Sequence, residues 1–271
     1  MPEIDVVHLA IAPPAALDGE LVKKVAAIVG KTPYETRFRL SGKIPKIIAN
    51  YDTMQMAELA AQGLRELGLV VLLCTDSELR RPWLIFKARS LKFEEQAITF
   101  YDKAGQARQM DAGETFIILS ARMQAYTETQ VTETTRKLNI TATLLLGGIP
   151  ITKKAEKKVT SRSYQTESFL RLYGRTSPEP ALQIRQHEFD YTFLGTEMVT
   201  SATANFGMTI KKIREAYSQA IFDDSLIEPF GADMPVAIVQ DTIEANCKLI
   251  YWYRQAISKA TSVETHPGVE L

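Results

Sequence analysis

The sequence predicts an α+β protein made of two folded regions and a C-terminal helix. Residues 1–78 alternate short apolar runs with amphipathic segments that begin at capping residues, which indicates strands and helices in turn. Residues 79–230 contain short strand-like runs separated by turn residues, followed by one helical pattern. Residues 231–271 carry a broadly apolar helical pattern and a polar end. The length of 271 residues exceeds that of a typical domain, which also favours several folded parts.

The first elements are delimited by residues that start and stop helices. The apolar run 6–11 ends before a pair of prolines and is typical of a buried strand. Asp18 is placed to cap the next helix, and Gly30 is placed to end it because glycine adopts the left-handed conformation of helix termini. Residues 32–35 read Thr-Pro-Tyr-Glu, a capping box that predicts a second, short helix as far as Leu40.

The remaining elements of this region follow from the same signals. Residues 44–49 predict a second strand and residues 69–74 a third. Between them, residues 52–55 read Asp-Thr-Met-Gln, a further capping box, and Gly68 ends the helix that follows. One face of that helix is predicted to be apolar and buried, with Met56, Leu59, Ala60, Leu64 and Leu67. The predicted order is strand, helix, short helix, strand, helix, strand.

Three motifs within residues 5–75 resemble those of a known domain. They are Val22-Lys23-Lys24-Val25 leading into Val29-Gly30, Tyr34-Glu35-Thr36-Arg37, and Met56-Ala57-Glu58-Leu59 leading into Leu67-Gly68. With this element order, the segment resembles the C-terminal domain of the bacterial ribosomal stalk protein. The motifs are mostly fold-making, so the resemblance implies a shared fold and a small protein-interaction module.

Two departures limit what the resemblance implies about binding. Residues 31–33 replace the glycine-rich turn that joins the first two helices in the family. Ala26 stands where the family has a basic residue on the face that recruits translation factors, whereas Lys23 and Arg37 are kept as basic residues. We therefore do not extend factor binding to this chain, but Lys23 and Arg37 are candidate binding residues.

The region 79–230 is predicted to be rich in strands. Residues 76–81 read as a charged linker, and Asn205 is placed to cap the one helix of the region. Strand patterns cover residues 83–88, 97–101, 106–110, 115–119, 168–173 and 181–186, with 127–135 as strand or exposed loop. About seven short strands followed by a helix are consistent with a pleckstrin-homology-like barrel. A partly open barrel and a plain sandwich fit as well.

A last helix is predicted over residues 236–260. Its apolar residues spread beyond one stripe: Val239, Ile243, Cys247, Leu249, Ile250, Trp252, Tyr253 and Ile257. A helix so broadly apolar must bury two sides. One interpretation is that the second side binds another copy of the chain and forms a homodimer. The other is that both sides are buried between the two folded regions.

Few residues are candidates for catalysis. His187 and Asp190 lie close in sequence and could provide a general base, but in a strand they would lie on opposite faces. Asp223 and Asp224 are adjacent carboxylates that could hold magnesium, although a turn or a helix cap is favoured. No known catalytic or nucleotide-binding motif occurs, so we predict no cofactor and no metal site. An enzyme of unrecognised type, with a cleft between the two regions, is therefore the second hypothesis.

A third hypothesis concerns Lys153, Lys154, Lys157 and Lys158, which are predicted to lie in an exposed loop. Such a loop could bind phosphate on lipid headgroups or nucleic acid, although a solvated charge run is the simpler interpretation. The whole chain has 32 basic and 32 acidic residues. A net charge of zero argues against a dedicated nucleic-acid binder and against binding to anionic lipid by charge alone.

The leading hypothesis is a non-enzymatic interaction or regulatory protein with a protein partner in the cytoplasm. Two distant cysteines do not form the framework of a secreted disulfide-rich domain. Acidic residues at Glu3 and Asp5 do not fit a signal peptide. The longest run without charge, residues 138–152, is too short for a transmembrane helix.

Overall fold

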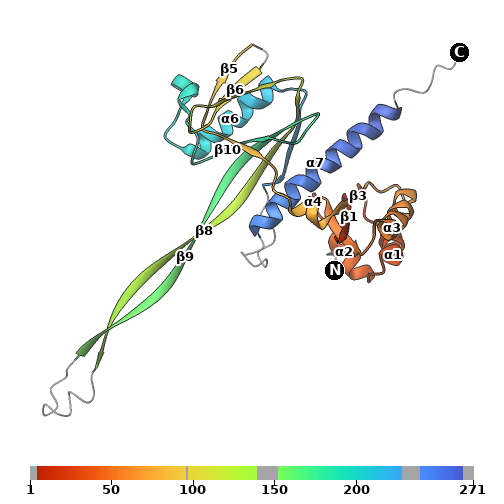
Figure 1. Cartoon of the computed structure of the whole chain (residues 1–271), viewed down its shortest axis with the longest axis horizontal. Helices are drawn as coiled ribbons and strands as arrows, with labels where there is room; N and C mark the ends of the chain where they lie inside the picture. The colour runs from red at the N-terminus through yellow and green to blue at the C-terminus, as the bar shows by residue number, and fades with distance from the viewer. Residues whose placement is uncertain (1–4, 96, 139–151, 228–238, 265–271) are drawn as a thin grey trace. The chain divides into compact units, whose positions relative to one another are not determined.

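The computed structural model describes residues 5–95, 97–138, 152–227 and 239–264 (Figure 1). Side chains are described for these residues except 124–165, 239–242 and 261–264. The chain contains helices and several sheets, which confirms the α+β class. It divides into two compact units, one of Met1–Met123 with Ser168–Leu271 and one of Gln124–Glu167. The division into 1–78, 79–230 and 231–271 stays a prediction.

The N-terminal module has the predicted element order. It consists of β1 (Val7–Ile11), α1 (Gly19–Val29), α2 (Pro33–Leu40), β2 (Lys46–Tyr51), α3 (Met54–Glu66) and β3 (Val71–Thr75). The sheet has the order β2-β1-β3, and β1 is antiparallel to both neighbours. Residues of β1, α1 and α3, among them Leu9, Val25 and Leu64, form its fully buried core.

The predicted caps of α1 and α2 are confirmed. The Asp18 carboxylate accepts a hydrogen bond from the Leu21 amide at 2.6 Å, and Gly30 has a φ of +64°. The Thr32 hydroxyl accepts from the Glu35 amide at 3.3 Å, and the Glu35 carboxylate accepts from the Thr32 amide at 3.2 Å. These local bonds satisfy amide groups and carbonyls that a helix end would leave unpaired.

The predictions for α3 and the segment after β3 need correction. Thr53, and not Asp52, caps α3. Met56 and Leu59 are 56% and 76% exposed and do not belong to the buried face. That face consists of Ala57, Ala60, Ala61 and Leu64, of which Ala60 and Leu64 were predicted. Small alanines let the helix lie close to its neighbours. Residues 76–81 are not a linker: Asp76–Arg80 form the short helix α4, which Thr75 caps.

The remaining strands form two sheets. A five-stranded sheet has the order β11-β8-β9-β10-β4, and a three-stranded sheet has the order β5-β6-β7. The strands are β4 (Ile85–Ala88), β5 (Ser90–Phe93), β6 (Ala97–Tyr101), β7 (Ala107–Asp111), β8 (Thr115–Leu138), β9 (Thr152–Gly174), β10 (Ala181–Arg185) and β11 (Ile221–Leu226). The predicted hairpin of β6 and β7 is confirmed. The pleckstrin-homology-like barrel is wrong for the described strands, because β10–β4 and β11–β8 pair in parallel within an open sheet.

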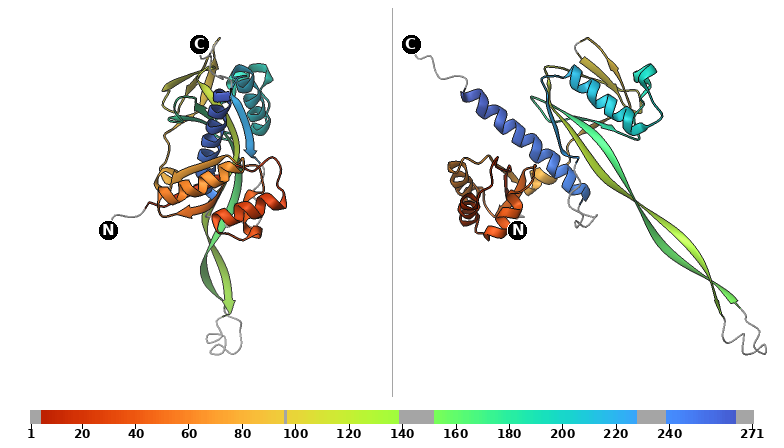
Figure 2. Two further views of the ribbon diagram at one scale, coloured as in Figure 1. Left: turned by 90° about the vertical axis from the view of Figure 1, so that its right-hand side faces the viewer. Right: turned by 180° about the vertical axis from the view of Figure 1, so that it is seen from behind.

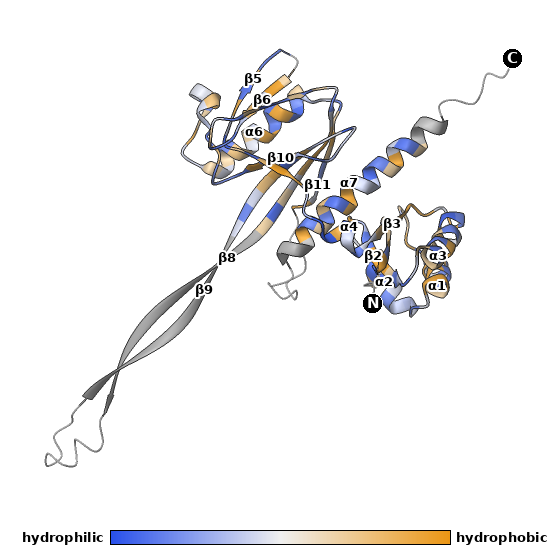
Figure 3. Cartoon of the chain, in the orientation of Figure 1, coloured by the Kyte–Doolittle hydropathy of each residue, from blue (hydrophilic) through white to orange (hydrophobic). Residues whose placement is uncertain are grey.

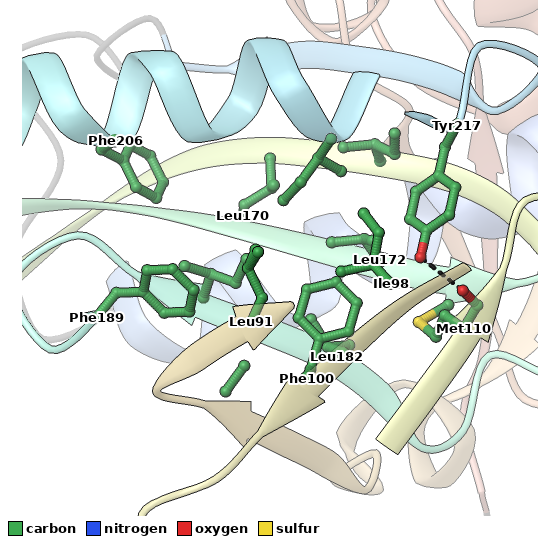
Figure 4. Close-up of a cluster of buried hydrophobic side chains, with 14 of the residues drawn as sticks. Leu91, Ile98, Phe100, Met110, Leu170, Leu172, Leu182, Phe189, Phe206 and Tyr217 are labelled. Atoms are coloured by element: carbon green, nitrogen blue, oxygen red, sulfur yellow. Dashed lines mark hydrogen bonds between the residues drawn. The ribbon is translucent and has the colours of Figure 1, made fainter. Parts of the chain in front are cut away.

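One core lies between these two sheets and the helix α6 (Ala202–Ala216). It includes Leu91, Ile98, Phe100, Leu170, Leu172, Leu182 and Phe206 (Figure 4). Tyr217, at the end of α6, donates a hydrogen bond to the Met110 carbonyl at 2.7 Å. Ser201, and not Asn205, caps α6. Asn205 is buried inside the helix, and its side chain bonds the backbone N–H and C=O of Val199 at 2.9 and 2.8 Å.

The last helix, α7 (Val239–Glu264), buries residues in two different clusters. Ile243, Cys247, Ile250 and Tyr251 contact the five-stranded sheet. Leu249 packs with Ala10, Leu72 and Cys74 of the N-terminal module, and Trp252, Tyr253 and Ala256 border the same cluster. Figure 3 shows hydrophobic residues alternating with hydrophilic ones along α7. Both apolar sides of the described helix are therefore covered within the chain, as the second interpretation of this helix expects. The predicted helix start before residue 239 lies outside the described residues.

The second unit is a two-stranded ribbon. Residues 124–138 of β8 and 152–167 of β9 run side by side as a twisted pair (Figures 1 and 2). Residues 153–158 belong to β9, so the expectation of an exposed loop at Lys153–Lys158 is wrong. The side chains of these lysines lie outside the described residues.

Candidate functional site

The predicted catalytic pair lies after β10 and not in a strand: His187 is in a turn, and Asp190 is in the irregular segment that follows. Both residues are exposed. The Asp190 carboxylate accepts hydrogen bonds from the Thr192 amide at 2.9 Å and the Thr192 hydroxyl at 3.0 Å. It thereby orders the start of the short 3-10 helix η1 (Thr192–Glu197). Glu188 between them forms ion pairs with Arg89 and Arg185, both at 2.7 Å.

The predicted carboxylate pair Asp223 and Asp224 lies in β11, so the turn or helix cap favoured by the sequence is wrong. Neighbouring residues of a strand lie on opposite faces, and here Asp223 is buried while Asp224 is exposed. Asp223 accepts two hydrogen bonds from the Arg254 guanidinium of α7, at 3.0 and 2.6 Å. Within the described ranges, no group of three metal-ligating side chains is brought together. Asp223 thus holds α7 to the sheet.

Two further buried charges link α7 to its neighbours and were not identified from the sequence. Arg171 of β9 is 5% exposed and pairs with Glu244, and its Nε donates to Gln183 at 2.7 Å. Burial is the largest single effect and lowers the pKa of Arg171. The hydrogen bonds with Glu244, together with the charges of the neighbouring ionisable groups, outweigh it, so the net shift is upward. Lys248 donates to the carbonyls of Glu78, Leu79 and Arg81 at the carboxyl end of α4. The sequence signal for both is a charge within an otherwise apolar stretch.

The buried cysteines have no nucleophilic character. Burial raises the pKa of the Cys74 thiol to about 12 and that of the Cys247 thiol to about 11. Since the thiolate is the reactive form, both thiols are inert near neutral pH. Cys74 lies under Leu249 of α7, and Cys247 lies against the five-stranded sheet.

A shallow hollow of about 460 Å³ lies beside α6. Gly207, Ile210, Lys211, Arg214 and Phe222 are among the residues that line it. The Arg214 guanidinium stacks on the Phe222 ring at 4.0 Å, which leaves this cation engaged with the wall. Glu215 also lines the hollow and pairs with Lys211 of the same helix at 3.9 Å.

Two aromatic side chains on α2 are far more exposed than such residues usually are. Tyr34 and Phe38 are 83% and 71% exposed. They are four residues apart and therefore lie on the same side of the helix. The opposite side buries Thr36 and Leu40. Each ring costs free energy while it stays in water, so this pair is a candidate contact site.

The segment that carries this aromatic pair is rich in basic residues. Residues 31–46 carry five basic residues and one acidic residue, Glu35. The Lys46 ammonium lies 5.6 Å from the centre of the Phe38 ring and donates to the Ser41 carbonyl at 2.6 Å. Burial lowers the pKa of Lys46, and the charge of Arg39 lowers it further. The region therefore has a positive local field.

The acidic residue of this segment, Glu35, is held by the cap of α2. Glu35 bonds the amide and the hydroxyl of Thr32 at 3.2 and 2.9 Å, and these bonds lower its pKa. We call Lys31, Tyr34, Arg37, Phe38 and Lys46 the α2 surface. Of the two binding residues predicted in the N-terminal module, it includes the exposed Arg37. The other, Lys23, lies on α1 and forms an exposed ion pair with Glu20 at 2.8 Å.

Comparisons with known proteins give no relative. No family model, no curated protein and no solved structure matches this chain. Among the helices that the structure describes, none combines the length and the apolar composition needed to cross a lipid bilayer.

Proposed function

We propose that the chain is a non-enzymatic interaction protein that binds a protein partner through the α2 surface. The observation that supports this most directly is the exposure of Tyr34 and Phe38, 83% and 71%, on one side of a rigidly capped helix. Aromatic residues and arginine dominate the binding energy of protein interfaces, and both occur here. The resemblance of residues 5–75 to a protein-interaction module points the same way.

The charges indicate what the partner presents. Five basic residues within residues 31–46 favour a partner whose apolar anchors are flanked by Asp or Glu. The cations would speed the encounter and set its orientation, while the two rings would supply most of the affinity. A cytoplasmic location belongs to the same proposal. Dimerisation through α7 is not part of the proposal, because Leu249 and Ile250 are buried within the chain.

Capture experiments with the full-length protein test the proposal. The Tyr34→Ser/Phe38→Ser variant is compared with the parent in lysate of the source cells. The matched control is Leu84→Ser/Met198→Ser, which also removes two apolar side chains, 67% and 48% exposed. We expect the parent and the control to retain the same proteins and the α2 variant to lose them.

Two results would contradict this function. Capture that is unchanged in the α2 variant would place the contact elsewhere. Capture that is lost equally in the control would show a non-specific apolar effect. An Arg37→Glu variant adds a charge test: its binding should fall and should depend less on salt than that of the parent.

A further inference from the structure

One arginine in the hollow beside α6 is held in place but is not paired with an acceptor. The Arg214 guanidinium lies over the Phe222 ring, 4.0 Å from its centre. This contact engages the flat face of the guanidinium and leaves the N–H groups in its plane able to donate elsewhere. Within the part of the chain that the structure describes, the Arg214 side chain forms no hydrogen bond and no ion pair. Phe222 therefore orients a cation whose donors are unused.

A glycine keeps the hollow open on the side of the helix. Gly207 lies inside α6, where glycine destabilises a helix relative to alanine. A Cβ at this position would meet no atom within 4 Å, so packing against a neighbour does not explain the glycine. The residue lines the hollow together with Ile210 of the next turn. A large side chain at position 207 would occupy space that is now accessible beside Arg214.

The lining combines this cation with an apolar wall. Ile210, Ala220 and Phe222 provide the apolar part. Lys211 and Glu215 contribute one charge of each sign, and they are 78% and 63% exposed and 3.9 Å apart. Since these two charges offset each other, Arg214 supplies the surplus positive charge of the hollow. Its volume of about 460 Å³ lies within the range of small-molecule sites.

The charges favour a carboxylate over a phosphate. A guanidinium matches the two oxygens of a carboxylate with two parallel hydrogen bonds. A phosphate monoester carries more negative charge, and two features of the hollow oppose it. Glu215 lines the hollow, and the lining residues 211–217 lie at the carboxyl end of α6, where the helix dipole is negative. The apolar wall suits a ligand whose body is aromatic or aliphatic.

We propose that the hollow beside α6 binds a small organic carboxylate, whose carboxylate pairs with Arg214 and whose apolar body lies against Ile210 and Phe222. The site belongs to α6 and β11, outside the α2 surface, and does not depend on the function proposed above. A protein partner on the α2 surface and a small ligand in the hollow are therefore tested separately.

Titration of the full-length, isotope-labelled protein with benzoate tests the proposal, with amide chemical shifts as the readout. Benzamide has the same ring without the charge, and phenyl phosphate has the same ring with more charge. Arg214→Gln removes the guanidinium, and Gly207→Leu fills the hollow with a residue that favours helix. The matched controls are Arg175→Gln, which removes an exposed arginine that lies over the Phe116 ring at 5.4 Å, and Ala204→Leu at an exposed position of α6.

We expect benzoate to give saturable shifts centred on residues 207–222 in the parent and in both controls, at concentrations up to about 10 mM. Benzamide and phenyl phosphate should bind more weakly. Both hollow variants should bind benzoate at least about tenfold more weakly, because a charged hydrogen bond or the space for the ring is lost. Arg214 is exposed, so its replacement should leave the fold intact.

Several results would overturn the proposal. The first is the absence of saturable shifts with benzoate, and the second is a set of shifts centred outside residues 207–222. Equal binding of benzamide would show that the charge has no role, and tighter binding of phenyl phosphate would contradict the choice of a carboxylate. A folded Arg214→Gln or Gly207→Leu variant that binds benzoate as well as the parent would also refute it.

Discussion

Two neighbouring side chains of α7 test whether this helix is internal on both sides. Leu249 is 2% exposed and packs with Ala10, Leu72 and Cys74 of the N-terminal module. Ile250 is 1% exposed and belongs to the core against the five-stranded sheet. Replacing a buried leucine or isoleucine by alanine costs about 2–5 kcal/mol. For Leu249→Ala and Ile250→Ala we expect about 3 kcal/mol each, because strands hold the surrounding side chains in place and limit collapse into the cavity.

Urea unfolding of the full chain measures both losses. The control is Leu59→Ala, which removes a side chain that is 76% exposed and should change stability by less than about 0.5 kcal/mol. An interface between two copies would make stability depend on protein concentration, whereas internal packing does not. The reasoning fails if Leu249→Ala costs no more than the control. It also fails if the loss varies over a roughly fiftyfold range of protein concentration.

Three further predictions concern local interactions. Glu244→Gln leaves the buried Arg171 guanidinium without its counter-charge and should lower the free energy of unfolding in urea by about 2 kcal/mol. The loss is smaller than for a fully buried pair because the Glu244 side chain is half exposed. An unchanged free energy of unfolding would contradict this. Thr32→Ala removes the capping box of α2 and should cost about 1 kcal/mol, whereas Thr32→Ser should cost much less. The hydrogen bond from His8 lowers the pKa of Asp76 below its ordinary value of 3.8, so this stabilisation is present above that pH and is lost as the pH falls through the folded-state pKa. A plot of unfolding free energy against pH should therefore be flatter in that acidic range for Asp76→Asn, and an identical slope would refute the assignment.

The N-terminal module could be predicted from the sequence because its signals act over a few residues. Asp18 and Thr32 accept hydrogen bonds from backbone amides at the start of the adjacent helix, and Gly30 ends one. Their roles therefore do not depend on the rest of the fold. Met56 and Leu59 were assigned to the wrong side of α3 for the opposite reason. Apolar spacing does not show which of two adjacent stripes faces the sheet, and here the stripe of small alanines does.

The sheet order of the second region depends on contacts between distant segments. Leu182 pairs with Phe86, and Phe222 with Ile118, both in parallel. The strands themselves could be identified because each is a short apolar run with turn residues at its ends. Their partners could not, since strand pairing depends on tertiary packing that a single strand does not encode.

The candidate site was predictable only in part. The helix that carries Tyr34 and Phe38, and the candidate role of Arg37, follow from the sequence. The exposure of the two rings does not, because it depends on which elements cover α2. The buried charges of Arg171 and Lys248 could not be predicted for the same reason. The sequence shows a basic residue, and only the fold shows which group accepts its hydrogen bonds.

Lys248 also sets an order of events during synthesis. Its ammonium closes the carboxyl end of α4, yet it is translated 170 positions after Glu78, whose carbonyl it binds. Until α7 leaves the ribosome, the carbonyls of α4 are without this donor, and Leu72 and Cys74 lack the cover that Leu249 provides. A chain that ends before α7 lacks both contacts, so Ala10, Leu72 and Cys74 lose the apolar cover that Leu249 gives them. Completion of the last helix supplies both contacts together, because Lys248 and Leu249 are neighbours on α7.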